Sequence, residues 1–315
     1  MSCSICTYIY SFTGIAVFLY LLKRWIRRGE YNKPTLIDNK IVVITGANTG
    51  IGKETAIDLA RRGGKIYIAC RDRSRGENAL VDIRRESGSD KVYFLQLDLA
   101  SLKSIRDFSK KFHQLESKLD ILINNAGIMA CPKLSTEDGF EMQIGVNHLG
   151  HFLLTNLLLD LLKSAAPSRI VNVSSKAHVR GEIYRDDFML DRSYAPVKSY
   201  AQSKLANILF TRKLANVLAG TKVTANSCHP GIVTTELARH IPKILQILMN
   251  TVFKTFLKTP VEGAQTQIRL AVDPDLETTT GRYFYDCEEH EPARLARDDD
   301  TAEWLWNKSA QLVRL

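Results

Sequence analysis

The stretch SYAQSKLAN, residues 199–207, places a tyrosine four residues before a lysine, Tyr200 and Lys204. In a helix this spacing puts both side chains on one face, one turn apart. Two interpretations are open. The pair is either an exposed surface pair over an apolar helix, or an acid–base device. In the second case the Lys204 ammonium lowers the pKa of the Tyr200 phenol, which then exchanges a proton near neutral pH.

The sequence around this pair alternates between short apolar runs and longer segments with helical periodicity. Apolar runs bounded by glycine and polar residues predict buried parallel strands, and the segments between them predict helices. We therefore expect an α/β fold: a doubly wound, Rossmann-type parallel sheet with helices on both faces, in a single catalytic domain. The expected strands are 40–47, 65–71, 91–99, 119–127, 168–175 and 223–231, and the expected helices are 51–63, 74–87, 101–117, 147–165 and 200–220.

Composition and charge are those of a globular protein. Of 315 residues, 45% are hydrophobic and 24% are charged, and the net charge is +9. The basic excess is concentrated before the first expected strand, and the rest of the chain shows no basic stripe with interleaved aromatic residues, so nucleic-acid binding is not expected. The basic residues of this cluster are Lys23, Arg24, Arg27, Arg28 and Lys33.

The N-terminal run ICTYIYSFTGIAVFLYLL, residues 5–22, contains no charged residue, and the basic cluster follows it. Its length is near the minimum for a membrane span, roughly 17–25 residues. A secretory signal carries its positive charge before the apolar run. We expect a membrane anchor over 1–22, a basic juxtamembrane linker over 23–38 and a catalytic domain over 39–315 that faces the cytosol. A cleaved signal and a buried amphipathic helix are the alternatives.

Cysteine and histidine patterns predict no metal site. The six cysteines are scattered, with neither a metal-ligand cluster nor a disulfide framework, which fits a reduced cytosolic domain. His148 and His151 stand three residues apart on an expected helix, without a third ligand. We expect them to pack inside the protein.

Glycine and polar residues follow the expected strands at the edge where such sheets bind ligands. After the first strand comes TGANTGIG, whose glycines allow backbone to approach a pyrophosphate at a helix N-terminus. A plain structural turn is the alternative. The fourth strand ends in NNAG, residues 124–127, where a small Ala-Gly pair lets a cofactor pass close to the backbone.

The end of the second strand bears on the choice of cofactor. Sheets that prefer NAD place an acid there for the ribose 2′-hydroxyl, whereas this chain has Cys70 and then Arg71. A guanidinium binds a 2′-phosphate through two hydrogen bonds, so we predict NADP(H). The alternative is that Arg71 is merely a solvated arginine. Asp72, the next residue, is an acid and argues against a 2′-phosphate at this position. Asp98, after the third strand, either accepts from an adenine amino group or caps the next helix.

The motifs TGANTGIG, NNAG, NHLG at Asn147, VNVSS, YAQSK and HPG occur in this order over about residues 40–235. Together they resemble the short-chain dehydrogenase/reductase superfamily. The resemblance implies a catalytic tetrad of Asn147, Ser175, Tyr200 and Lys204, with Tyr200 as the proton donor and acceptor. It also implies that Lys204 holds ribose hydroxyls and lowers the Tyr200 pKa, that Ser175 binds the substrate oxygen, and that Asn147 bends its helix and holds a water.

The same resemblance implies a set of contacts to NADP(H) from the strand ends, with Thr234 binding the nicotinamide carboxamide. The expected contacts are Gly46, Asn48, Thr49, Gly50, Ile51, Gly52, Arg71, Asp98, Leu99, Asn125, Ala126, Gly127, Tyr200, Lys204, Pro230, Gly231 and Thr234.

Within the superfamily the chain is most similar to the NADP(H)-dependent retinol dehydrogenases, or retinal reductases, in motifs such as IACRD, GVNHLGHFLLT and SKLANILFTRKLA. This implies a membrane enzyme that interconverts retinol and retinal, with reduction favoured. The expected location is the endoplasmic reticulum membrane, with a mitochondrial membrane as the alternative. Reduction of steroid, fatty-aldehyde or other lipid carbonyls and a non-catalytic dinucleotide-binding scaffold are the competing functions, and a homodimer is one option for assembly.

Two segments are expected near the substrate. Residues 176–199 separate Ser175 from Tyr200 and are interpreted as a loop beside the substrate mouth. Residues 239–260 carry apolar residues at helical spacing, interrupted by lysines, and form either a lid that touches the bilayer or helices packed on the core.

Overall fold

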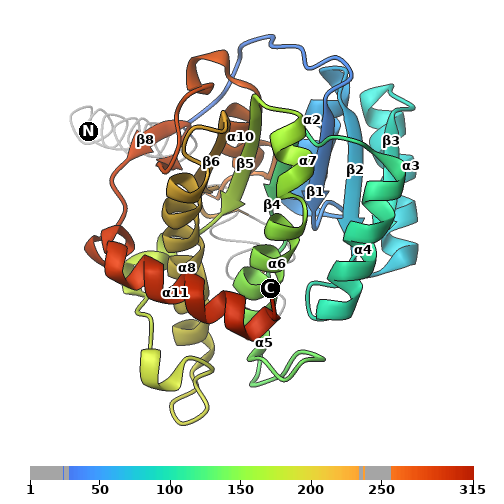
Figure 1. Cartoon of the computed structure of the whole chain (residues 1–315). Coiled ribbons are helices and arrows are strands. Elements are labelled where there is room, and N and C mark those ends of the chain that lie inside the picture. Colours follow the sequence, from blue (N-terminus) through green and yellow to red (C-terminus); the bar gives the residue numbers. More distant parts are fainter. Residues whose placement is uncertain (1–23, 25–27, 234–236, 238–256) are drawn as a thin grey trace, which may run out of the picture.

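The structure is a computed structural model that describes residues 24, 28–233, 237 and 257–315. Its centre is an eight-stranded sheet in the order β3-β2-β1-β4-β5-β6-β7-β8 (Figure 1). Every neighbouring pair is parallel except β7 and β8, which are antiparallel. The strands are β1 (Ile41–Thr45), β2 (Lys65–Cys70), β3 (Val92–Gln96), β4 (Ile121–Asn124), β5 (Ser168–Val173), β6 (Val223–His229), β7 (Tyr283–Tyr285) and β8 (Glu288–His290).

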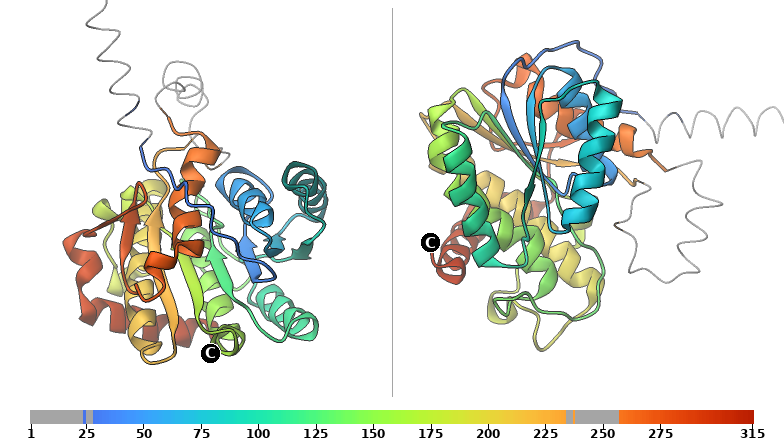
Figure 2. Two further views of the ribbon diagram at one scale, coloured as in Figure 1. Left: turned by 90° about the horizontal axis from the view of Figure 1, so that it is seen from above. Right: turned by 90° about the vertical axis from the view of Figure 1, so that its right-hand side faces the viewer.

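The helices cover both faces of this sheet, which confirms the predicted doubly wound α/β fold (Figure 2). One hydrophobic cluster joins the sheet to α2, α3 and α10, and a second joins its other face to α4, α6, α7 and α8. The main helices are α2 (Gly50–Arg61), α3 (Arg73–Ser87), α4 (Leu102–Leu115), α5 (Met142–Ile144), α6 (Gly150–Leu157), α7 (Leu159–Ser164), α8 (Pro196–Val217), α10 (Pro260–Val272) and α11 (Asp299–Val313). Short helical turns are η1 (Gly145–Leu149), η2 (Lys176–Arg180), η3 (Arg185–Asp187), η5 (Pro274–Leu276) and η6 (Arg294–Arg297).

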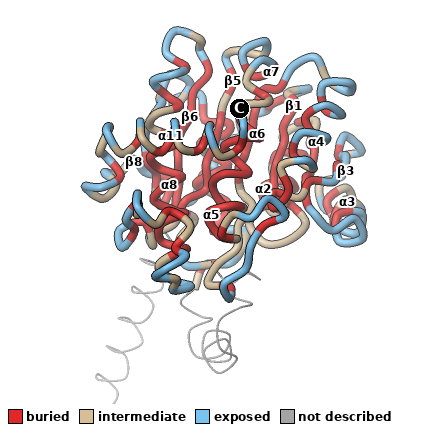
Figure 3. Tube along the Cα trace, turned by 60° about the horizontal axis from the view of Figure 1, so that its bottom comes forward, coloured by how far each residue is buried: buried red, intermediate tan, exposed pale blue. Residues whose placement is uncertain are grey.

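Local sequence accounts for where several helices begin. Ser101 caps α4 by accepting a hydrogen bond from the backbone N–H of Ser104. Thr259 and Glu262 form a capping box at α10, and Pro260 occupies the first helical position, where its missing N–H costs nothing. The buried residues concentrate in the strands, on the inner face of α2, and in α6 and the middle of α8, where consecutive residues are buried (Figure 3).

The expected continuous helix 147–165 is wrong in detail. The chain forms a π-helical turn, η1, in which the backbone N–H of Gly150 bonds to the carbonyl of Gly145, five residues earlier. A second break falls at Leu158, with φ −110° and ψ 5°. Apolar periodicity does not reveal such turns, because one inserted residue shifts the hydrogen-bond ladder without changing which side is buried.

The C-terminal part adds elements that the sequence patterns did not predict. Strand β7 has three residues, too few to show a period, and extends the parallel sheet beyond β6. Helix α11 packs on α8 in Figure 1. The ring of Trp306 lies with its centroid 5.9 Å from that of Phe210 in α8 and 5.0 Å from that of Phe152 in α6.

Residues 28–38, which belong to the expected linker, lie against the domain. Tyr31 and Ile37 are part of the core cluster that contains α2 and α10. The backbone N–H of Tyr31 donates to Oε1 of Gln265 at 3.1 Å, and Nζ of Lys33 lies 2.9 Å from Oδ1 of Asp273. Residues 28–38 are therefore packed against the catalytic domain.

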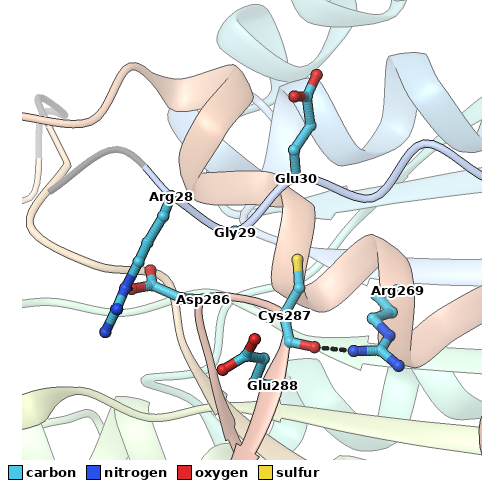
Figure 4. A pocket seen from close by; sticks show the side chains of 7 residues that line it. All are labelled: Arg28, Gly29, Glu30, Arg269, Asp286, Cys287 and Glu288. Carbon is cyan, nitrogen blue, oxygen red and sulfur yellow. Dashed lines mark hydrogen bonds and ion pairs between the residues drawn. The ribbon is translucent and has the colours of Figure 1, made fainter. Parts of the chain in front are cut away.

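A buried ion pair holds the start of this segment. Nζ of Lys258 lies 2.5 Å from Oδ1 of Asp286 and also donates to the carbonyl of Arg28 at 2.8 Å. Both side chains of the pair are almost fully buried. Beside them is a cavity of about 280 Å³ (Figure 4) lined by Arg28, Gly29, Glu30, Arg269, Asp286, Cys287 and Glu288. No member of the predicted tetrad lines this charged cavity.

Within the described part of the chain, no helix has both the length and the apolar character needed to cross a bilayer. The expected anchor, 1–22, lies outside the described residues, as does most of the segment 239–260.

Candidate active site

The four predicted catalytic residues come from three segments near the carboxyl ends of the strands. Ser175 follows β5, Asn147 lies in η1, and Tyr200 and Lys204 lie one turn apart in α8. Tyr200 is 6% exposed and Lys204 is 3% exposed. The interpretation as a surface pair is therefore wrong, because both side chains are in the protein interior.

The Lys204 ammonium is held at the end of β5. Its Nζ donates to the carbonyl of Val173 at 3.1 Å and lies 5.7 Å from the ring centroid of Tyr200. Gly127 leaves room beside it, since a Cβ atom at this position would lie 3.4 Å from Nζ. The amine thus faces the NNAG turn.

Burial moves the pKa values of the pair in opposite directions. It lowers the pKa of Lys204 to about 8 and raises the pKa of Tyr200 to about 12. A hydrogen bond with Ser175 lowers the Tyr200 pKa in part. The expected lowering by Lys204 is not found: burial, which disfavours the phenolate, sets the direction of the shift, and Ser175 is the neighbour that opposes it. Tyr200 is consequently a neutral phenol at neutral pH and holds a proton that it can donate.

Asn147 occupies the π-helical turn, so the helix distortion predicted at this residue is present. Its side chain is fully buried and pairs with the backbone of Ile128 twice: Oδ1 accepts the N–H at 2.9 Å and Nδ2 donates to the carbonyl at 3.0 Å. Nδ2 also donates to Oγ of Ser203 at 2.9 Å. Asn147 therefore fixes the chain directly after NNAG to α8.

Ser175 caps the short turn η2, with Oγ accepting the N–H of Ala177 at 3.2 Å. The carbonyl of Ser175 accepts from Nδ1 of His178 at 2.7 Å. The Ser175 hydroxyl also lowers the pKa of the Tyr200 phenol as a hydrogen-bonding neighbour, so the two groups lie close together.

The glycine-rich turn and NNAG pack against each other. Gly46 and Gly50 have φ values of +65° and +59°, which favour glycine. A Cβ on Gly46 would lie 2.8 Å from Cα of Ala126, so the turn admits no side chain there. Gly52 is equally crowded, against the side chain of Asn125.

This turn leads into the N-terminus of α2, and its polar groups fit a dinucleotide. Thr49 is the N-cap residue, but its hydroxyl makes no capping hydrogen bond. Oδ1 of Asn125 is buried and has no partner among the described residues. Asn48 precedes Thr49, Ile51 follows it by two residues, and both are half-buried. A pyrophosphate usually binds to the backbone N–H groups at the start of a helix that follows such a narrow glycine turn.

At the end of β2, Arg71 is exposed, and its carbonyl accepts from Nε2 of Gln96 at 3.0 Å. Asp72 is the N-cap of α3, where Oδ1 accepts the N–H of Arg75 at 3.0 Å. The Asp72 carboxylate is thus engaged in capping its own helix. Arg71 is the first charged residue after β2, and the exposed Arg73 follows two positions later.

The alternative in which Asp98 caps the helix is wrong. Oδ1 of Asp98 accepts from the N–H of Ala100 at 2.9 Å, in a local turn, while Ser101 provides the cap. Leu99 beside it is buried. At the end of β6, Pro230 and Gly231 are described, with Gly231 at φ +90°, whereas Thr234 lies outside the described residues.

Gln143 and Tyr194 join the site and were missed by the sequence patterns. Gln143 is fully buried; its Oε1 accepts the N–H of Ala130 at 2.8 Å and its Nε2 donates to the carbonyl of Pro196 at 2.9 Å. The Tyr194 hydroxyl donates to the carbonyl of Cys131 at 2.7 Å. These bonds connect the loop 176–199 to the chain after NNAG. In the sequence, Gln143 is only a glutamine near the start of a helix, and this position does not indicate which groups its side chain contacts.

Two further polar residues lie in the interior behind the site: Thr45 is fully buried and His151 is 2% exposed. His148 and His151 are buried, and the described residues contain no cluster of groups suited to a metal ion.

A parallel sheet with a dinucleotide turn at its switch point, next to a buried tyrosine–lysine pair, defines the class of nicotinamide-dependent oxidoreductases. The short chain dehydrogenase family matches residues 40–245, and the chain belongs to this family. It is an oxidoreductase that acts on alcohols and uses a nicotinamide dinucleotide.

The chain is similar to several retinol dehydrogenases over most of its length. It is 52% identical to human retinol dehydrogenase 14 over 92% of this chain and 90% of that protein. It is 50% identical to human retinol dehydrogenase 13, over 94% of this chain and 91% of the relative.

Two solved structures share the fold. An uncharacterised protein of Mycobacterium paratuberculosis is 37% identical, with a TM-score of 0.73 over 89% of this chain and 95% of that one. RhlG of Pseudomonas aeruginosa, solved as an active-site complex with NADP, is 26% identical, with a TM-score of 0.65 over 80% and 97% of the two chains.

Proposed function

We propose that this protein is a membrane-anchored, NADP(H)-dependent retinol dehydrogenase that works mainly as a retinal reductase. The observation that carries the catalytic part is the buried Tyr200–Lys204 pair, with the Ser175 hydroxyl on the phenol and Asn147 behind it. The retinoid substrate is supported by the likeness to the retinol dehydrogenases. NADP(H) is supported by the exposed Arg71, by the engagement of Asp72 in a helix cap, and by the NADP complex of RhlG.

Bound NADPH supplies the hydride for the carbonyl carbon, and the chain supplies the binding groups. The N-terminus of α2 with Thr49 would hold the pyrophosphate, and Arg71 would bind the 2′-phosphate. Lys204 lies beside the small Gly127, where it would hold the ribose hydroxyls.

The proton comes from Tyr200. Its Oη donates to the carbonyl oxygen as negative charge develops there, and the Ser175 hydroxyl donates a second hydrogen bond to the same oxygen. The Lys204 ammonium stabilises the phenolate that remains. In the oxidation direction Tyr200 accepts the proton from the alcohol. Asn147 fixes the position of the NNAG turn relative to α8, and we propose that it also holds a water through which Lys204 exchanges protons with solvent.

The experiment is turnover by the full chain in detergent micelles, with all-trans-retinal and NADPH or NADH, followed by cofactor absorbance. Tyr200→Phe is the matched variant, because it removes one oxygen atom. We expect turnover that is faster with NADPH, and a fall in kcat of about 10²–10⁴ in the variant, the usual contribution of a general acid. NADPH binding should be unchanged. A protein that binds NADPH but leaves retinal unreduced would refute the retinoid assignment, and activity retained in Tyr200→Phe would refute the mechanism.

The anchor and its location are part of the proposal. Residues 1–22 would enter the endoplasmic reticulum membrane, with 23–38 as the juxtamembrane segment and 39–315 as the catalytic domain in the cytosol. The uncharged run followed by basic residues supports this orientation. The test is carbonate extraction of membranes from cells that express the full chain or a chain that lacks 1–22. We expect only the full chain to stay with the membranes, and equal extraction of both would refute the anchor.

A further inference from the structure

His151 lies in α6, one turn after Asn147, and is 2% exposed. Each of its ring nitrogens takes part in one hydrogen bond. Nδ1 is 3.0 Å from the carbonyl oxygen of Asn147, and Nε2 is 2.8 Å from Oγ1 of Thr45. The ring therefore connects η1 to the end of β1, more than a hundred positions away in the sequence.

The direction of both bonds follows from their partners. A carbonyl oxygen only accepts, so the hydrogen of the neutral ring is on Nδ1. Nε2 then presents a lone pair, and the Thr45 hydroxyl must donate to it. Burial keeps the ring in this neutral form, since it lowers the His151 pKa to about 4.

The Thr45 side-chain oxygen is the hydrogen-bond acceptor for the NNAG turn. Oγ1 accepts the backbone N–H groups of Asn125 and Ala126, both at 2.9 Å. Its hydroxyl hydrogen needs an acceptor on the remaining side. Nε2 of His151 at 2.8 Å is closer than the alternative, the carbonyl of Ile123 at 3.5 Å. The histidine thus orients the hydroxyl so that both lone pairs face the turn.

The far end of the same turn is held by Asn147, through its two bonds to the backbone of Ile128. The bonds form a closed circuit: Asn147 carbonyl, His151 ring, Thr45 hydroxyl, NNAG turn, Asn147 side chain. Gly127 is within this circuit, and a Cβ there would lie 3.4 Å from Nζ of Lys204 and 3.5 Å from Oδ1 of Asn147.

We propose that His151 is a positioning residue for the hydride-transfer reaction, which closes this circuit and so fixes the NNAG turn relative to Lys204. The inference rests on the proposed function, in which this turn contacts the cofactor. Without the ring, the Thr45 hydroxyl is free to rotate and the turn loses its fixed distance from Asn147. A shift of about 1 Å at a reacting centre lowers rates by about 100-fold.

The experiment compares three variants of the full chain in detergent. His151→Leu removes both hydrogen bonds. His151→Gln keeps a group that reaches Thr45, and is the conservative rescue. His148→Gln is the matched control, because His148 is equally buried and next to Asn147, but its Nε2 bonds to Oγ of Ser309 on α11 and not to the circuit.

The measured quantities are kcat per folded molecule, the Kd of NADPH by fluorescence titration, and thermal stability. We expect His151→Leu to lose about 10–100-fold in kcat and to bind NADPH several-fold more weakly. His151→Gln should recover most of both losses. His148→Gln should lose stability alone, with kcat and Kd within about twofold of the parent protein.

Unchanged kcat and Kd in folded His151→Leu would overturn the proposal, and so would equal losses in His148→Gln. If His151→Leu does not fold, His151→Asn tests the same connection, because its amide donates to the Asn147 carbonyl but is too short to reach Thr45. The NADPH Kd needs no turnover. It therefore separates failure of this inference from failure of the retinoid assignment, which affects turnover alone.

Discussion

Replacement of Lys204 by methionine should stabilise the cofactor-free protein while abolishing its activity. Lys204 is buried, and burial lowers its pKa from 10.5 to about 8. This difference corresponds to a cost of about 3 kcal/mol to the folded state at any pH below 8. Methionine has a similar length and no charge to desolvate.

Part of this gain is offset by a lost hydrogen bond. Nζ of Lys204 donates to the carbonyl of Val173, a bond worth about 1 kcal/mol. The Val173 carbonyl keeps one hydrogen bond after the substitution, because Nδ2 of Asn207 also donates to it at 3.1 Å. The expected net gain at pH 7 is therefore about 2 kcal/mol in the free energy of unfolding.

The sign of the pH dependence follows from proton counting. Between pH 8 and 10.5 the unfolded chain keeps the Lys204 proton and the folded chain has lost it, so the parent protein gains stability as pH rises. The advantage of Lys204→Met should accordingly shrink to less than about 0.5 kcal/mol near pH 9.5. Measurements should stay below pH 10. Above that, the Tyr200 pKa of about 12 makes the parent lose stability as pH rises.

The assay is equilibrium unfolding by urea, followed by tryptophan fluorescence, at pH 7 and pH 9.5. Lys198→Met is the control, since Lys198 is on the same helix, is partly exposed and bonds to Ser193; it should change stability by no more than about 0.5 kcal/mol at either pH. A Lys204→Met protein that is less stable than its parent at pH 7, or an advantage that does not depend on pH, would refute the reasoning.

Two further substitutions test cofactor choice and the packing of the N-terminal segment. Arg71→Glu should raise the KM for NADPH at least about tenfold through charge repulsion while leaving the KM for NADH within about threefold; steady-state kinetics with both cofactors decide it, and equal changes would exclude a 2′-phosphate contact. Asp286→Asn should destabilise the protein by about 3–5 kcal/mol, because it leaves the Lys258 charge buried and unpaired. Urea unfolding measures this loss, and the double variant with Lys258→Met should recover much of it; no recovery would show that the charge is not its cause.

The sequence determined the features that depend on local chemistry. Apolar runs and polar strand ends specified the order of strands and helices from β1 to β6, because side-chain periodicity follows directly from backbone geometry. The turn at Gly46 and Gly50 was readable because positive φ values favour glycine at both positions. The four residues of the candidate tetrad were found through the motifs around them, and the fold places all four near the carboxyl ends of the parallel strands.

Only the tertiary structure decided the properties that depend on distant neighbours. Burial set the direction of the Tyr200 pKa shift, opposite to the one expected from its spacing to Lys204, since the desolvation of a charge depends on everything packed around it. The bond between Thr45 and His151 joins residues that share no sequence pattern, and so does the packing of Tyr31 against α10. Sequence spacing fixes which residues share one helix face or strand, whereas the contacts between elements arise when the sheet brings them together.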